Sequence, residues 1–197
     1  MSTFYRALAA LFVLGAPALA ATPAPGIENF AQVDEHVYRG AQPTSEGLDY
    51  LAKIGVKTVL DLREKGERAS REEVRVKALG MQYVNVPMTG LTPPTANEIT
   101  RILVLLENPT PGPVFVHCMR GADRTGAVIA AYRIDHDHWE NARALNEALG
   151  FGMSFFQLPR QNFIRKFHPL PSIEAPRTSM APRANDGSMP PAQANAV

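Results

Sequence analysis

The chain has 197 residues, of which 45% are hydrophobic, enough for one compact domain with its own core and too few for two. Its 20 Lys and Arg residues face 19 Asp and Glu residues, and the formal net charge of +1 excludes the strongly basic surface that nucleic acid or an anionic membrane would attract. A single cysteine excludes an internal disulfide framework and a multi-cysteine zinc site.

Residues 1–20 predict a secretory signal peptide. Arg6 supplies a short positive region, and residues 7–14 form an apolar run too short to cross a bilayer. An Ala-Leu-Ala cleavage site ends at residue 20, so we expect the mature chain to begin at Ala21 with no net charge. Pro17 and this site disfavour the alternative, a buried N-terminal helix. We therefore expect an exported protein, secreted or periplasmic, without a transmembrane span.

The C-terminal residues 169–197 consist mainly of Pro, Ala, Ser, Asn and isolated charges. They show no periodic apolar pattern that could offset the entropy lost on ordering, so they predict a disordered tail. Residues 21–26 form a short leader of similar composition. The folded domain is expected over residues 27–168.

Strand and helix patterns alternate through this domain. Thr44 and Thr95 are predicted helix N-caps, and Glu98 completes a capping box with Thr95. The helix over residues 125–134 is apolar nearly all round, which predicts a buried central helix. The alternation predicts an α/β fold with a central, mostly parallel sheet flanked by helices. Strands are expected at residues 30–39, 57–62, 81–87 and 114–116, with the strand at 81–87 buried. Helices are expected at residues 44–54, 70–79, 95–106, 125–134, 139–149 and 155–167.

The chemistry is concentrated after the last predicted strand, where the sequence reads Val-Phe-Val-His-Cys-Met-Arg-Gly-Ala-Asp-Arg-Thr-Gly over residues 114–126. The loop lies between the carboxyl end of a strand and the start of a helix, the place where ligands bind in open α/β sheets. Its backbone N–H groups can turn toward one centre and, with the helix dipole, bind an anion. The residues expected to line this phosphate-binding loop are Met119, Arg120, Gly121, Ala122 and Thr125.

Two side chains of this loop complete a reactive set. Cys118 lies near a helix N-terminus and an arginine, which stabilise a thiolate and make it nucleophilic. Arg124 can donate two parallel hydrogen bonds to a phosphate. The Thr125 hydroxyl can donate to the sulfur, and His117 can hold the loop through hydrogen bonds. The set suits attack on phosphorus through a phosphocysteine intermediate that water then cleaves.

The pattern His-Cys-x5-Arg-Thr resembles the signature of the protein tyrosine phosphatase superfamily, in its dual-specificity-like branch, which includes bacterial members. The stretches 37–43, 59–63 and 121–126 resemble that branch too, and the likeness spans most of residues 30–165. It implies a cysteine-phosphatase fold, Cys118 as nucleophile and Arg124 as phosphate ligand. It also implies that no metal or cofactor is needed and that the substrate is a phosphoprotein, a phosphoinositide or an inositol phosphate.

One departure concerns the general acid. The branch usually places an aspartate after the strand that precedes the phosphate-binding loop, whereas residues 86–91 contain no carboxylate. Asp123 is the predicted replacement, since relatives such as the myotubularins place an aspartate there; the alternative is that it steadies the loop. Glu98 is a further candidate, although its capping box already explains it.

Structural explanations compete at several of these positions. A lone cysteine is usually a small buried apolar side chain, which this loop makes improbable. For Asp61 and Arg63 a structural ion pair is favoured over a substrate site, and for residues 135–138 (Asp-His-Asp-His) a solvated turn is favoured over a metal site. Arg120 is as well suited to recruiting an anionic substrate as to pointing into solvent.

The preferred interpretation is a cysteine-dependent phosphomonoester hydrolase of the protein tyrosine or dual-specificity type. The alternatives are a phosphoinositide or inositol phosphate phosphatase, and a catalytically weak phosphate-binding protein, which the missing upstream acid would explain. A rhodanese-like sulfurtransferase ranks lower, because its loop cysteine would not need an arginine six residues later.

Overall fold

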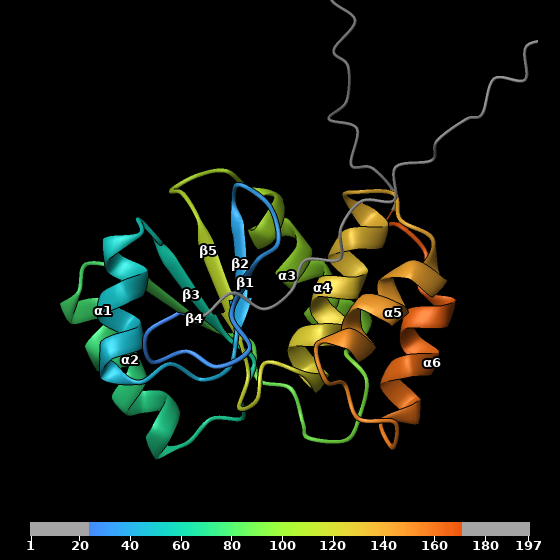
Figure 1. Ribbon diagram of the computed structural model, residues 1–197, viewed down its shortest axis with the longest axis horizontal. Helices are drawn as coiled ribbons and strands as arrows, with labels where there is room; N and C mark the ends of the chain where they lie inside the picture. The colour runs from blue at the N-terminus through green and yellow to red at the C-terminus, as the bar shows by residue number, and fades with distance from the viewer. Residues whose placement is uncertain (1–23, 171–197) are drawn as a thin grey trace, which may run out of the picture.

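A single sheet with helices on both faces forms the protein, shown as a computed structural model that describes residues 24–170 (Figure 1). The strand order is β1-β2-β5-β3-β4; β1 pairs with β2 antiparallel and every other pair is parallel. The predicted α/β fold with a mostly parallel sheet is therefore confirmed. The strands are β1 (Ala31–Gln32), β2 (Val37–Gly40), β3 (Thr58–Asp61), β4 (Gln82–Asn85) and β5 (Val114–His117).

The helices divide between the two faces of the sheet. Helices α1 and α2 cover one face and α3 to α6 the other, each group enclosing its own apolar core (Figure 1). The larger core lies between the sheet and α3, α4 and their neighbours. The helices are α1 (Ser45–Lys53), α2 (Glu67–Ala78), α3 (Ala96–Glu107), α4 (Asp123–Asp135), α5 (Asn141–Gly150) and α6 (Leu158–Lys166).

Local sequence signals set several helix ends as predicted. The Thr44 hydroxyl accepts the Gly47 amide at 3.2 Å and caps α1, while Gly55 follows that helix at a φ of +90°. At α3 the capping box between Thr95 and Glu98 forms in both directions.

Four expectations about these elements need correction. The strand expected at residues 30–39 is two strands, β1 and β2, joined by residues 33–36. Strand β4 is not buried, because it lies at the edge of the sheet with one side uncovered. Helix α2 begins at Glu67, three residues earlier than expected, since its first turn is polar and carries no apolar period. Helix α6 begins at Leu158 rather than residue 155, so Phe155 and Phe156 lie exposed in the preceding loop.

The central strand positions the functional loop. All four residues of β5 are buried between β2 and β3, and the strand register places Gly40, His117 and Asp61 side by side at one edge. Helix α4, buried from Thr125 through Ile134, begins just beyond that edge. The connection between β5 and α4 is therefore fixed at both ends by the most buried elements of the fold.

The predicted signal peptide and nearly all of the predicted tail lie outside the described residues. Leu170, placed in the tail by its composition, instead packs partly buried against the larger core, and its amide donates to the Asp135 carboxylate at 2.6 Å. A partner 35 residues away is invisible to local composition. Among residues 24–170, none of the helices is long and apolar enough to cross a membrane.

Candidate active site

The connection from Cys118 to Arg124 takes the shape that an anion-binding loop needs. Gly121 has a φ of +67°, and an added Cβ would collide with the backbone of Gly40 and Ala41, so only glycine fits there. The Gly121 carbonyl is turned away to accept a hydrogen bond from Arg39 Nη2 at 2.9 Å. The predicted need for glycine in this turn thus has a direct steric cause.

Arg39 is a functional residue that the sequence analysis did not single out. It is 1% exposed, on strand β2, with its guanidinium 3.8 Å from the centre of the Phe151 ring. Burial lowers its pKa to about 10, with Glu147 and Cys118 opposing that shift through their charges. An arginine in an otherwise apolar strand was the available signal, because a buried arginine must have a polar partner.

Cys118 lies at the bottom of the loop and is 2% exposed. Burial alone would raise the pKa of its thiol, but the hydroxyl and amide of Thr125, the charge of Arg124 and the amide of Arg120 together lower it. The Thr125 hydroxyl is buried and has no oxygen or nitrogen partner within the described chain, which leaves it free to donate to the sulfur. Thr125 and Arg124 therefore lie where they can act on the thiol, and their roles toward a thiolate stay predictions.

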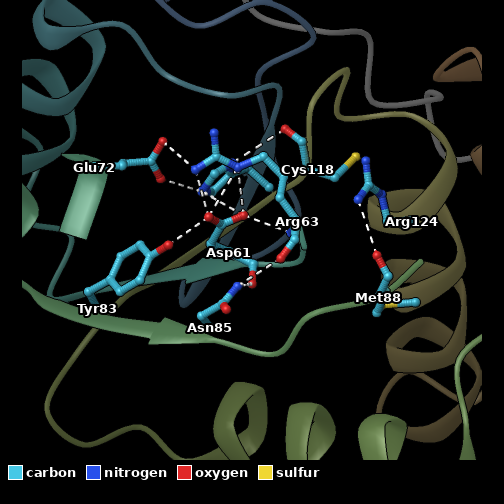
Figure 2. A network of polar contacts seen from close by, with 9 residues as sticks. Asp61, Arg63, Glu72, Tyr83, Asn85, Met88, Cys118 and Arg124 are labelled. Carbon is cyan, nitrogen blue, oxygen red and sulfur yellow. Dashed lines mark hydrogen bonds and ion pairs between the residues drawn. The ribbon is translucent and has the colours of Figure 1, made fainter. Parts of the chain in front are cut away.

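Arg124 stands half-buried at the start of α4 and reaches across the loop. Its Nη1 donates to the carbonyl oxygen of Met88 at 3.2 Å (Figure 2). Met88 belongs to the segment that follows β4, where the branch usually carries its acid. The other donors of the guanidinium make no protein hydrogen bond within residues 24–170, so they are available to an anion above Cys118.

A buried ionic cluster supports the loop from behind (Figure 2). Arg63 Nη2 donates to Asp61 at 2.6 Å and to Glu72 at 2.9 Å, and the Tyr83 hydroxyl donates to Asp61 at 2.6 Å. Burial would raise the pKa of Asp61, but the hydrogen bonds from Arg63 and the nearby His117 lower it. Asn85 adds hydrogen bonds to the carbonyl groups of Asp61 and Arg63. The structural interpretation of the Asp61–Arg63 pair is confirmed.

His117 connects this cluster to Cys118. Its Nε2 lies 2.8 Å from Glu72 Oε1, and its Nδ1 lies 3.3 Å from the carbonyl oxygen of Cys118. Asp61, Glu72 and His117 bring potential metal-binding atoms within 4.8 Å of one another, but Arg63 donates to both carboxylates and supplies the cation there. The residues thus form a buried structural cluster that contacts the backbone of Cys118 through His117.

Asp123 and Arg120 both face the loop between α5 and α6. Asp123 Oδ1 accepts the Ser154 amide at 2.9 Å, and its Oδ2 lies 3.5 Å from Arg120 Nη1. The exposed Arg120 also donates to the Gly152 carbonyl at 3.1 Å. This geometry suits a carboxylate that positions the loop, and the acid role of Asp123 stays a prediction. Glu98 accepts the amide and hydroxyl of Thr95 at 2.7 and 2.8 Å in the capping box.

Arg160 is the second residue that the sequence did not single out. It is fully buried on α6 and donates to the carbonyl oxygens of Thr89 at 2.6 Å and Gly90 at 2.8 Å. Burial and the charge of Arg124 lower its pKa, whereas Asp123 and Cys118 oppose that shift. Arg160 therefore holds in place the backbone next to Met88, whose carbonyl oxygen accepts the hydrogen bond from Arg124. No motif marked it, because its partners are main-chain carbonyls far away in sequence.

Away from the loop, the residues 135–138 lie at the end of α4, as predicted for a turn. Asp137 accepts Arg133 Nη1 at 2.6 Å and lies 2.8 Å from His136 Nδ1, and Asp135 accepts the Leu170 amide. Asp137 is thus explained by a local ion pair, and Asp135 by a hydrogen bond to a distant backbone amide.

The chain is similar in sequence and fold to known proteins. The family described as "DSP-PTPase phosphatase fused to NAD+ Kinase" matches residues 24–166. The dual specificity protein phosphatase TpbA of Pseudomonas aeruginosa is 32% identical over 154 residues, covering 72% of this chain and 68% of TpbA. Its crystal structure superposes with a TM-score of 0.65 at 26% identity, covering 76% of this chain and 90% of that one.

Two further relatives are longer than the matched region. The inositol diphosphatase SIW14 of Saccharomyces cerevisiae is 28% identical over 146 residues, covering 71% of this chain and 51% of the yeast protein. A probable chloroplastic NAD kinase 2 of Oryza sativa is 29% identical over 102 residues, covering 49% of this chain. This chain spans only 10% of that kinase and about half of the yeast protein.

The buried position of Arg160 generates a prediction about phosphate affinity. Replacing Arg160 by Ala removes the donors that hold the Met88–Gly90 backbone. The Met88 carbonyl oxygen, which accepts from Arg124, is then no longer held in place. We expect inhibition by inorganic phosphate to weaken about tenfold, equivalent to the loss of about one charge-assisted hydrogen bond, measured well below the melting temperature of the variant.

Arg165→Ala on the same helix is the matched control, since Arg165 is exposed and its hydrogen bonds stay within α6. Arg160→Lys should restore part of the affinity by keeping a cation near the two carbonyls. A variant whose melting temperature falls but whose phosphate inhibition is unchanged would show that Arg160 serves the fold alone.

Proposed function

The chain belongs to the dual-specificity-type branch of the protein tyrosine phosphatase superfamily, and we propose that it hydrolyses phosphomonoesters with Cys118 as the nucleophile. The observation that carries this proposal is a single buried thiol whose pKa is lowered at the start of α4, beside an arginine with unused donors. The family match over residues 24–166 supports it.

The reaction follows from the loop geometry in two displacements. The Cys118 thiolate attacks phosphorus, a sulfur–phosphorus bond forms, and the bond from phosphorus to the alcohol or phenol oxygen breaks. Arg124 keeps its Nη1 bond to the Met88 carbonyl while its other donors bind two phosphate oxygens, and the amides of the loop bind the remaining oxygens. Water then attacks the phosphocysteine, breaks the sulfur–phosphorus bond and releases inorganic phosphate and the thiolate.

The departing oxygen must gain a proton, and the segment after β4 offers no carboxylate for that step. Asp123 is the acid that we propose, on its position at the start of α4, where the loop ends and Arg120 lies beside it. The competing role, in which it only orders Ser154, rests on the amide hydrogen bond already present. The two roles predict different substrate dependence.

The substrate class that we propose is a phosphorylated tyrosine or other protein side chain, because TpbA is a dual specificity protein phosphatase whose variant was solved in complex with pTyr. An inositol phosphate is the second candidate, supported by the similarity to SIW14, an inositol diphosphatase. We further propose that the protein is exported, on the signal-like sequence of residues 1–20.

Replacing Cys118 by Ser tests the covalent mechanism. A serine hydroxyl is hardly ionised under conditions where the thiolate exists, so p-nitrophenyl phosphate hydrolysis should be abolished while vanadate or phosphate binding is largely retained. In parallel, Arg124→Lys should lose about 10²–10³-fold in kcat/KM, because a point charge cannot make the paired contact. Turnover of the serine variant near the wild-type rate would rule out a phosphocysteine intermediate.

Replacing Asp123 by Asn separates its two candidate roles. An acid typically contributes about 10²–10⁴-fold, and alkyl phosphates depend on it more than aryl phosphates with good leaving groups. If Asp123 is the acid, the variant should lose far more activity on alkyl phosphates, and the alkaline limb of its pH–rate profile should flatten. Equal losses on both substrates, together with weaker phosphate binding, would assign Asp123 to loop positioning.

A further inference from the structure

Exposed apolar side chains gather around the phosphate-binding loop. Among residues 24–170, large apolar side chains are exposed at eight positions. Three of these are scattered singly over α2, α3 and α5, and Met119 lies in the loop itself. The other four come from the segments that follow β4 and α5, and they form what we call the apolar rim: Leu91, Phe155, Phe156 and Leu158. Single exposed apolar side chains are ordinary, whereas a group of them indicates a contact surface.

Both segments of the apolar rim are hydrogen-bonded to residues of the proposed catalytic loop. The amide of Ser154, directly before Phe155, donates to Asp123 at 2.9 Å. The Met88 carbonyl, three residues before Leu91, accepts from Arg124 at 3.2 Å. In Figure 1 the two segments lie at the same end of the molecule as the start of α4. The rim therefore borders the entrance through which a phosphate reaches the loop.

Hydrogen bonds between the two segments give the rim a fixed base. Gln157 and Arg160 both donate to the Gly90 carbonyl, at 3.2 and 2.8 Å. The rings of Phe155 and Phe156 lie with their centres 3.8 Å apart, yet these residues remain 69% and 78% exposed. A surface that is already ordered loses little conformational entropy when a ligand covers it.

The charges at the entrance indicate the chemistry of the ligand. Residues 86–97 and 148–159, which carry the rim, contain no Asp, Glu, Lys, Arg or His. Cationic side chains adjoin the rim only in the loop, at the exposed Arg120 and at Arg124. A matching ligand has an apolar part directly beside its phosphate. A membrane surface would favour lysine or arginine among the apolar side chains, which these two segments lack.

We propose that the apolar rim binds apolar side chains next to the phosphorylated residue of a protein substrate, so that the enzyme selects segments that are apolar around the phosphate. The proposal rests on the phosphatase function above and narrows its substrate class. Cys118 is 2% exposed, so a phosphorylated side chain must reach inward while its neighbours in the peptide stay at the entrance. There they would remove the exposed rings of Phe155 and Phe156 from water, which is favourable.

Replacing Phe155 and Phe156 together by Ser tests the rim, because both side chains are exposed and lie outside the two apolar cores. The measured quantity is the ratio of kcat/KM for two phosphotyrosine peptides of equal length and charge, one with Leu and the other with Ser on each side of the phosphotyrosine. We expect a ratio of about ten for the wild type and of about one for the double variant, since partial burial of two phenyl rings is worth about tenfold.

The matched control is Val74→Ser with Val104→Ser, which removes two apolar side chains that are 70% and 56% exposed on α2 and α3. This control should keep the peptide ratio within about twofold of wild type. Hydrolysis of p-nitrophenyl phosphate, which has no flanking residues, should stay near the wild-type rate in both double variants. A wild-type enzyme without preference for the Leu peptide, or an unchanged ratio in the Phe155 and Phe156 variant, would overturn the proposal.

A binding measurement separates the rim from the chemistry. The two peptides, fluorescently labelled, are titrated into Cys118→Ser and into Cys118→Ser that also carries the Phe155 and Phe156 substitutions. The added substitutions should weaken binding of the Leu peptide about tenfold and leave the Ser peptide nearly unaffected. If the wild type hydrolyses no phosphomonoester while this difference persists, the proposed function fails and the rim stands. Equal affinities with and without the two rings would reject the rim as a peptide-binding surface.

Cosedimentation with vesicles of phosphatidylcholine and phosphatidylglycerol tests the other possible occupant, a lipid surface. We expect the wild type to stay in the supernatant. Sedimentation that the Phe155 and Phe156 substitutions abolish, together with an unchanged peptide ratio, would assign the rim to a lipid surface and contradict the proposal.

Discussion

The burial of a reactive thiolate is the constraint on which this structure depends. Cys118 is 2% exposed, and removing a charge from water is unfavourable unless donors replace the lost solvent. The amides of the loop, the Thr125 hydroxyl and Arg124 provide those donors, and they overcome the effect of burial on the pKa. The same donors are the ones that a phosphoryl group would use, so the loop that lowers the pKa of Cys118 is also the loop that we propose binds the substrate.

Two buried arginines keep those donors in place. Arg63 joins Asp61 and Glu72, and through them His117, which lies against the carbonyl of Cys118. Strands β3 and β5 therefore end at a cluster to which helix α2 contributes Glu72 from its middle turn. On the far side of the loop Arg160 fixes the backbone after β4. Breaking a buried pair leaves an uncompensated charge, and the loop geometry is therefore tied to the stability of the domain.

The features that could be predicted from the sequence are those that depend on residues close together in the chain. The Cys118–Arg124 spacing, the need for Gly121, the capping box at Thr95 and the alternating elements are encoded within a few residues of one another, and the structure has each of them. Arg39 and Arg160 were missed because their partners, the carbonyls of Gly121, Thr89 and Gly90, are 70 or more residues away. The edge position of β4 depends on strand order, which residue composition does not specify.

The thiolate itself offers the most direct test, because Cys118 is the only cysteine of the chain. The rate of alkylation by iodoacetamide, measured against pH, reports the thiolate fraction of that one residue. The account predicts a midpoint below about 8.5, the value of a free cysteine, and a shift toward that value in Arg124→Ala. A wild-type midpoint at or above the free-cysteine value would contradict the claim that this loop stabilises a buried nucleophile.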